Sequence, residues 1–354
     1  MNKKIREIVD ACKEDCAAGR DQKKSTIVEL LEVDPASDDA LYIRAAADEL
    51  TRAATGCRGW VSFSIGLDYV PCKGNCRFCC FGAEWGIVNG DNANVLTHDQ
   101  IIATAKSHLE QGATSVTLRT TEFYPHDDLV ELTRRMRAEV PGNYRLGINT
   151  GELSLQDCID FYEAGANSAA HMLRLREGVD TGIDPEIRLR TIENIKASPL
   201  RWGCCIDPVG PEHTPEEIAD LFLKYHELGS NTCNIMKRSN VAGTPLGDAD
   251  YGELTEEQCL LYAGALRICS GVSRVGGCHP ATEATLHSGG CNMGIETGAV
   301  PRTEKFVEGE WPPRQVADAI AAIERAGLRK AGADELDPRQ MDAPQANAGC
   351  SCCG

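Results

Sequence analysis

Residues 60–80 read WVSFSIGLDYVPCKGNCRFCC, a short apolar run followed at once by a polar loop that holds four cysteines. The run VSFSIGL at 61–67 is predicted to be a β-strand. Soft thiolates select zinc, Cu(I) or iron–sulfur clusters. Cys72, Cys76 and Cys79 lie in one short loop, so they can hold three irons of a cubane cluster and leave the fourth iron open to a further ligand.

Two other uses of these thiols stay open. A zinc site normally needs four ligands in two close pairs, whereas Cys80 directly follows Cys79 and cannot easily chelate beside it. Buried structural thiols are the second alternative, but the loop at 73–77 is more polar than a core segment. An iron–sulfur cluster is therefore the preferred interpretation.

Outward from this strand, the chain repeats one plan: a helix-capping residue, an amphipathic stretch, a glycine and a short β-prone run. The plan occurs at 97–120, 154–173 and 214–236, and WVSFSI, YRLGIN and RWGCCI add further strands. Strands separated by helices predict parallel strands joined by right-handed crossovers. The predicted fold class is α/β, a (β/α) TIM-type barrel that is complete or partly open. The cysteine loop then lies at the C-terminal mouth of the barrel, where such folds build active sites.

Composition divides the chain into three parts. Residues 1–55 form a predicted N-terminal helical extension, residues 56–330 form the barrel, and residues 331–354 form a flexible tail that is poor in apolar residues. The tail carries Cys350, Cys352 and Cys353. Cys12 and Cys16 are one helical turn apart, so we expect surface or packing thiols there, with metal binding as the alternative.

The bulk charge excludes several classes of partner. The 354 residues carry a net charge of −17 without a basic cluster, which argues against nucleic acid and anionic lipid as partners. No apolar run reaches the roughly 18 residues that cross a bilayer, and the first residues lack a signal-peptide core. We therefore expect a cytoplasmic protein. In that setting 18 cysteines favour metal ligation or redox chemistry over disulfides, because cytosolic reductants keep thiols reduced.

The segment CKGNCRFC at 72–79 resembles the C-x3-C-x2-C loop of the radical S-adenosylmethionine (SAM) superfamily, in which an aromatic residue, here Phe78, precedes the last cysteine. The resemblance extends over about 55–330. It implies that Cys72, Cys76 and Cys79 bind a [4Fe–4S] cluster, whose fourth iron is chelated by the amino and carboxylate groups of SAM. Electron transfer into SAM then cleaves its S–C5′ bond and yields a 5′-deoxyadenosyl radical. A flavodoxin or ferredoxin is implied as the electron donor.

Several blocks in order, from GELSLQD at 151–157 to GTPLGD at 243–248, look like one branch of that superfamily. The branch contains biotin synthase, the [FeFe]-hydrogenase maturase that cleaves SAM, and methylornithine synthase. Glu122 falls where the family contacts the SAM amino group, and Arg188 falls where the branch places an Arg against the SAM carboxylate. The plain alternatives are a solvent-exposed Glu122 and an Arg188 on a helix surface.

The chain departs from biotin synthase where that enzyme binds a second cluster through three cysteines and an Arg. The matching positions here are Thr117, Asn149 and Cys204, and Val272 stands in for the Arg, with Arg274 two residues further on. Only one position keeps its thiol, which puts a [2Fe–2S] cluster of that kind in doubt. Asn149 is kept as a candidate cofactor contact.

The polar pair that reads the ureido ring in biotin synthase is also replaced, by Met172 and Arg174. A cationic Arg174 prefers a carboxylate or another anionic group. Arg174 is therefore the fourth candidate for cofactor binding, beside Glu122, Arg188 and Asn149. This change makes a standard biotin synthase reaction a poorer interpretation.

The remaining cysteines suggest an auxiliary iron–sulfur cluster, with the tail folding over the barrel mouth. Its candidate ligands are Cys204, Cys205, Cys278, Cys291, Cys350, Cys352 and Cys353. A metal-trafficking or sulfur-relay tail and an inert end are the alternatives for the last three.

The sequence thus predicts an anaerobic radical SAM enzyme that abstracts hydrogen from an unactivated carbon of a small-molecule or acyl-carrier substrate. By analogy with biotin and lipoyl synthesis, it would be a sulfurtransferase that inserts sulfur taken from the auxiliary cluster. The first rival is a radical rearrangement or metallocofactor maturation in the same branch. The second is a non-catalytic iron–sulfur scaffold or electron carrier.

Overall fold

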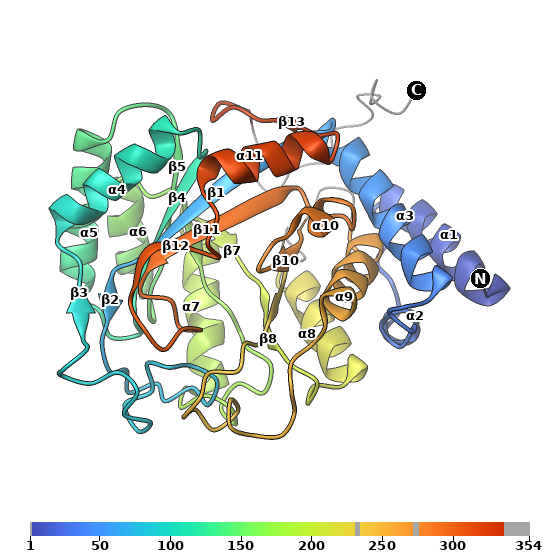
Figure 1. The fold of residues 1–354 in the computed structure, drawn as a ribbon, viewed down its shortest axis with the longest axis horizontal. Helices are drawn as coiled ribbons and strands as arrows, with labels where there is room; N and C mark the ends of the chain where they lie inside the picture. The colour runs from blue at the N-terminus through green and yellow to red at the C-terminus, as the bar shows by residue number, and fades with distance from the viewer. Residues whose placement is uncertain (1, 231–233, 272–275, 336–354) are drawn as a thin grey trace.

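The computed structural model describes residues 2–230, 234–271 and 276–335 of the chain. Its main sheet is parallel across most of its width (Figure 1). In spatial order the strands are β12 (Val307–Trp311), β11 (Asn292–Gly298), β1 (Arg58–Gly66), β4 (Ser115–Arg119), β5 (Arg145–Asn149), β6 (Ser168–Ala170) and β7 (Arg201–Gly203). Strand β12 runs antiparallel to β11, and β13 (Arg329–Lys330) pairs with the first two residues of β1.

A second sheet of three parallel strands completes the barrel. It contains β8 (Ile206–Val209), β9 (Ile235–Lys237) and β10 (Cys278–His279). Only Cys204 and Cys205 separate β7 from β8, so the last strand of the main sheet is followed directly by the first strand of the second sheet. A parallel bridge between Gly276 and Gly290 joins the segments that lead into β10 and β11. The two sheets surround one interior, and the predicted α/β barrel is confirmed in a form whose hydrogen bonding is interrupted between β7 and β8.

Helices cover the outside of these strands. Three of the helices begin at the capping residues that the sequence predicts. The covering helices are α4 (His98–Glu110), α5 (His126–Glu139), α6 (Leu155–Glu163), α7 (Pro185–Ala197), α8 (Pro215–Glu227), α9 (Glu256–Ile268), α10 (Glu283–Leu286) and α11 (Val316–Arg325). Thr97, Ser154 and Thr214 each form a capping box with the residue three positions on. Gly112 follows α4 with a φ of 113°, a conformation that only glycine adopts without strain.

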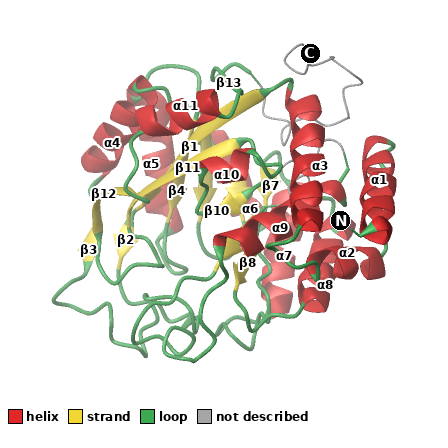
Figure 2. Cartoon of the chain, turned by 45° about the vertical axis from the view of Figure 1, so that its right-hand side comes forward, coloured by secondary structure: helices red, strands yellow, loops and turns green. Residues whose placement is uncertain are grey.

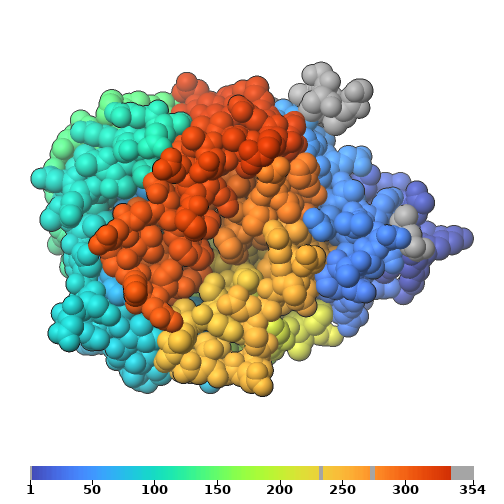
Figure 3. Space-filling model, in the orientation of Figure 1, coloured from blue at the N-terminus to red at the C-terminus, as the bar shows by residue number. Residues whose placement is uncertain are grey.

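The first 55 residues form three helices on one side of the barrel (Figures 2 and 3). These are α1 (Lys3–Ala17), α2 (Lys24–Leu31) and α3 (Asp38–Thr55), which pack mainly on α8 and α9. Cys12 and Cys16 are each 1% exposed within this packing, so they are packing thiols rather than surface thiols. None of the helices that the described residues form is long and apolar enough to span a bilayer.

The two ends of β1 lie near the cysteine loop and near the last described residue. The cysteine loop follows the C-terminal end of β1, after β2 (Asp68–Tyr69), which pairs with β3 (Asn94–Val95). At the other end, Glu335 is the last residue described, and its carboxylate lies 3.6 Å from Arg58 at the start of β1. The predicted tail ligands Cys350, Cys352 and Cys353 lie outside the described residues.

Candidate active site

The centre of the barrel holds a cavity of about 430 Å³. Barrel interiors are usually filled by bulky branched side chains. Here the strands line the cavity with many short residues, together with longer polar ones such as Arg145, Arg201 and Asn292. The short residues are Ser62, Ser64, Ser115, Thr117, Gly147, Ser168 and Gly294. Because such side chains cannot fill the space between the strands, the interior stays open beneath the cysteine loop.

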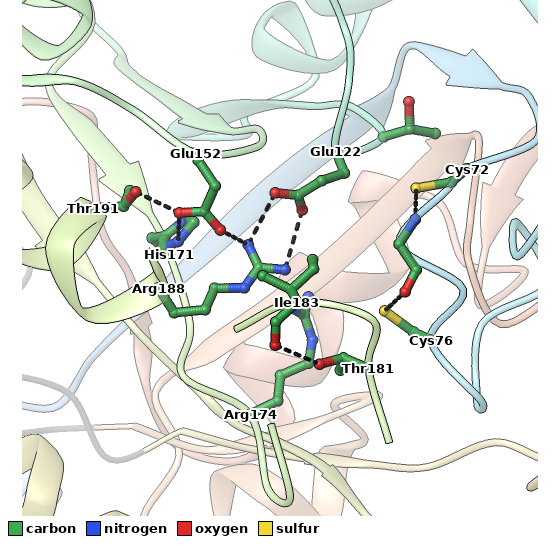
Figure 4. Close-up of polar contacts among 12 residues, drawn as sticks. Cys72, Cys76, Glu122, Glu152, His171, Arg174, Thr181, Ile183, Arg188 and Thr191 are labelled. Carbon is green, nitrogen blue, oxygen red and sulfur yellow. Dashed lines mark hydrogen bonds and ion pairs between the residues drawn. The ribbon is translucent and has the colours of Figure 1, made fainter. Parts of the chain in front are cut away.

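Three of the four loop cysteines line this cavity. Cys72, Cys76 and Cys79 are partly exposed along its wall, whereas Cys80 is fully buried, with Sγ 3.7 Å from the carbonyl oxygen of Val300. The backbone N–H of Gly74 donates to Cys72 Sγ at 3.4 Å, and the carbonyl of the same glycine lies 3.8 Å from Cys76 Sγ (Figure 4). The fold therefore separates the three predicted cluster ligands from their neighbour.

The electrostatics of the loop fit a cationic centre. Burial raises the pKa of the Cys72 thiol, raises that of Cys76 to about 11 and raises that of Cys79 well above its ordinary value. Neighbouring thiols add to the pKa shifts of Cys76 and Cys79, because thiolates repel one another, and the charges of Glu122 and Asp68 add to that of Cys72. Three thiolates are therefore costly here unless positive charge binds among them. The irons of a cluster supply that charge, and thiolates are the ligands that such clusters use.

Glu122 and Arg188 are brought together at the same cavity (Figure 4). Glu122 follows β4, and its carboxylate oxygens lie 3.3 and 3.1 Å from Nη1 and Nη2 of Arg188, which comes from α7. Arg188 is only 2% exposed, and the side chain of Glu122 is 13% exposed. The structure thus excludes the alternatives of a surface Arg and an exposed Glu, while their contacts to SAM stay a prediction.

Two more carboxylates face Arg188. Its Nη1 lies 2.7 Å from Glu152 Oε1, and its Nε lies 3.6 Å from Glu177 Oε2. Burial tends to raise the pKa of Glu152, but hydrogen bonding to His171 and the charge of Arg188 lower it to about 2. One guanidinium facing three carboxylates leaves this group of residues negatively charged, and Glu122 and Arg188 are the two of them that line the cavity. Such charge suits a sulfonium and an ammonium group, both of which SAM carries.

Asn149 and Arg174, the other two predicted cofactor contacts, also line the cavity. Arg174 Nε lies 3.8 Å from Asp207 Oδ2, and its guanidinium carbon is 6.0 Å from the centroid of Phe78 in the cysteine loop. Burial raises the pKa of Asp207, although the charge of Arg174 opposes that shift. Arg174 thus lies between the cysteine loop and strand β8, with one carboxylate as its partner.

The described candidates for an auxiliary cluster lie in different surroundings. Cys205 lines the cavity, and Cys204 does so while its Sγ lies 2.9 Å from Ser230 Oγ. Cys278 belongs to the core and lies 3.2 Å from Thr285 Oγ1. Cys291 packs in a small core cluster with Trp60 and Ala331. Two of the four thus line the cavity and two are buried in the core, and their role as ligands of an auxiliary cluster stays a prediction. Val272 and Arg274 lie outside the described residues.

Sequence reasoning missed a second charged group in the cavity. Glu296 on β11 accepts hydrogen bonds from Arg119, at the end of β4, and from Arg302, which follows β11. Burial tends to raise the pKa of Glu296, but the two guanidinium groups lower it to about 2. Alternate residues of a strand face the same side, and this pattern could have pointed to Glu296. Asn292, Gly294 and Glu296 are every second residue of β11, and all three line the cavity.

The chain is similar to biotin synthases of several organisms. It is 25% identical over 288 residues to a biotin synthase of Rippkaea orientalis, covering 77% of this chain and 76% of that protein. It is 25% identical over 331 residues to a biotin synthase of Streptomyces avermitilis, covering 88% and 80%. No family model matches the chain.

Solved structures show the same fold. Methylornithine synthase superposes with a TM-score of 0.75 at 17% identity, covering 92% of this chain and 98% of that one. A maturase of the [FeFe]-hydrogenase superposes with a TM-score of 0.75 at 13% identity, covering 92% and 75%.

Proposed function

We propose that this chain, a member of the biotin synthase-like branch of the radical SAM superfamily, removes a hydrogen atom from an unactivated carbon of a small molecule. The observation that carries the proposal is that three thiols of one loop and the Glu122–Arg188 pair line a single cavity. When bound there, a [4Fe–4S] cluster and SAM supply an electron and a 5′-deoxyadenosyl radical.

The residues of the chain have separate tasks in this proposal. Cys72, Cys76 and Cys79 hold the cluster, Glu122 accepts from the ammonium of SAM, and Arg188 donates to its carboxylate. Glu152 fixes Arg188 from the side away from the loop, through Nη1 at 2.7 Å. Binding SAM then requires Arg188 and Glu122 to exchange their mutual contact for contacts with the cofactor.

The barrel itself provides position and exclusion of water. The reactive carbon must lie within contact distance of the radical carbon, and the short side chains of the strands leave room for it in the cavity. A mostly enclosed site protects a reactive radical from side reactions with solvent. A flavodoxin or ferredoxin is the proposed source of the electron.

The finer proposal is sulfur insertion from an auxiliary cluster. Cys204 and Cys205 support it, because both line the cavity. A rearrangement or a cofactor maturation step without sulfur is the second candidate. It is favoured by Thr117 and Asn149, which line the cavity with oxygen and amide groups where biotin synthase has thiols. The two candidates differ in the number of clusters they require.

The first test is cleavage of SAM by the anaerobically reconstituted, reduced protein. We expect 5′-deoxyadenosine to form, and its absence would favour an iron–sulfur scaffold or electron carrier. The second test compares the iron and sulfide content and the Mössbauer spectra of the full chain and of a chain truncated before Cys350. A full chain with only four irons would exclude the sulfur-donor cluster, and an unchanged cluster content after truncation would exclude the tail as its ligand.

A further inference from the structure

The side of the cavity formed by β4 and β11 carries positive charge that the proposed cofactor contacts do not use. Arg119 and Arg302 both donate to Glu296, and all three line the cavity. Two guanidinium groups against one carboxylate leave these three side chains with a net charge of about +1, and His279, which also lines the cavity, adds positive charge when it is protonated. A buried charge is costly unless an opposite charge joins it. This side of the cavity therefore favours an anion.

Both guanidinium groups also have donors left over. Arg119 donates through Nη2 to the carbonyl of Ala299 at 2.8 Å, and Arg302 Nη1 contacts only a weak acceptor, Met236 Sδ, at 3.3 Å. The Nε atoms of both are buried without a hydrogen-bond partner among the described residues. The side chains are 14% and 9% exposed, and Arg302 packs over the ring of Trp311. Fixed, buried and incompletely paired donors are a ready-made anion site.

We propose that Arg119 and Arg302, held in place by Glu296, bind a carboxylate group of the substrate, so that the substrate is a small carboxylic acid. This inference rests on the proposed function, in which the substrate enters the same cavity. A carboxylate supplies the single negative charge that this side lacks, whereas a phosphate group carries close to two. The volume of about 430 Å³ is shared with the cofactor, which favours a small molecule over an acyl carrier.

The carboxylates around Arg188 disfavour that group as a second site for the substrate carboxylate. Glu122, Glu152 and Glu177 surround Arg188 and repel a second carboxylate. The anionic end of the substrate is therefore expected at Arg119 and Arg302 rather than at Arg188.

The test uses two probes of the same shape, hexanoate and hexanamide, which differ in charge. Their binding to the reconstituted holoenzyme is measured by titration calorimetry, with and without SAM and without turnover. We expect hexanoate to bind about tenfold to a hundredfold more tightly, the range for hydrogen bonds to a charged group. Equal affinities, or no binding of either probe, overturn the proposal.

Substitutions test whether Arg119 and Arg302 cause the preference for hexanoate over hexanamide. Arg302→Met and Arg119→Met should remove the preference for hexanoate, and Arg302→Lys should retain part of it. Glu296→Gln should tighten hexanoate binding, because it leaves two positive charges without their carboxylate, whereas a purely structural role predicts weaker binding of both probes. The matched control is Arg325→Met, which removes an Arg that is 60% exposed on α11.

The two proposals fail in different ways. If SAM is cleaved but Arg302→Met keeps the preference for hexanoate, the carboxylate site is wrong and the proposed function stands. If hexanoate is preferred through these arginines but SAM is not cleaved, the anion site stands and the radical function is wrong. Should Arg302→Met fail to fold, the comparison of the probes on the wild type and on Glu296→Gln still decides the question.

Discussion

The two sides of the barrel cavity are built from the same kinds of residue in opposite proportions. Around Arg188, one guanidinium faces Glu122, Glu152 and Glu177. Around Glu296, one carboxylate faces Arg119 and Arg302. The first arrangement is suited to a cationic cofactor and the second to an anionic substrate. The difference teaches that charge balance within a cavity, rather than the net charge of −17 on the whole chain, indicates which ligand belongs on which side.

The largest expected effect is the loss of cofactor chemistry from the cysteine loop. Cys76→Ala should reduce 5′-deoxyadenosine formation to background, because only two thiolates remain for the cluster. Cys80→Ala is the matched control, since Cys80 is buried away from the cavity beside the three ligands. Iron content and rapid-quench product analysis measure both variants. If Cys80→Ala loses iron as completely as Cys76→Ala, the assignment of the loop ligands is wrong.

The second prediction concerns the carboxylates around Arg188 and is tested by the free energy of unfolding. Arg188→Met should lower the free energy of unfolding by about 3–5 kcal/mol, because it leaves buried carboxylates without their counter-charge. Urea titration of the wild type and the variant gives this difference. Arg325→Met should stay within about 0.5 kcal/mol of the wild type, as expected at an exposed site. A comparably small effect at Arg188 would mean that water, not the guanidinium, balances the three carboxylates.

The positive side should show its own pH signature. The pKa of Glu296 is lowered from its ordinary 4.5 to about 2, so its contribution to stability is present above about pH 4.5 and is lost as the pH falls toward 2. The wild type should therefore be more stable than Glu296→Gln at pH 6, by up to about 3 kcal/mol. The difference should shrink between pH 5 and pH 3 when unfolding is followed by circular dichroism. A difference that is constant with pH would show that Glu296 acts through packing alone.

The smallest effect concerns affinity for SAM. Glu122→Gln keeps the shape of the side chain and removes its charge, so SAM should bind about tenfold more weakly, as expected for losing one charge-assisted hydrogen bond. Equilibrium dialysis with radiolabelled SAM measures this change without turnover. Hexanoate binding should not weaken in this variant, since the two sides of the cavity act on different ligands. A parallel loss of both affinities would contradict the division.

Much of the architecture followed from local sequence. Capping boxes at Thr97, Ser154 and Thr214 and the glycines that end the helices use interactions among residues close in the chain. Their spacing predicted the alternation of helix and strand, and therefore the barrel. The Cys72, Cys76 and Cys79 loop was recognised for the same reason, because its ligands lie within eight residues of one another.

Other parts of the site could not be read locally. Arg119 is far from Glu296 and Arg302 in the chain, and it meets Glu296 only because β4 and β11 lie on either side of β1. Cys278 and Cys291 are candidate metal ligands in the sequence, and only the structure shows that both are buried in the core. The chain alone cannot say which side of a strand faces a cavity until its neighbours are placed.

The sequence by itself determined the order of helices and strands, the loop of soft ligands and the class of cofactor, since each depends on short-range spacing and on side-chain chemistry. Tertiary structure decided which charges share the cavity and which thiols are buried, because both depend on how distant strands pair. Electrostatic balance is a property of groups close in space, and only the folded barrel brings those groups together.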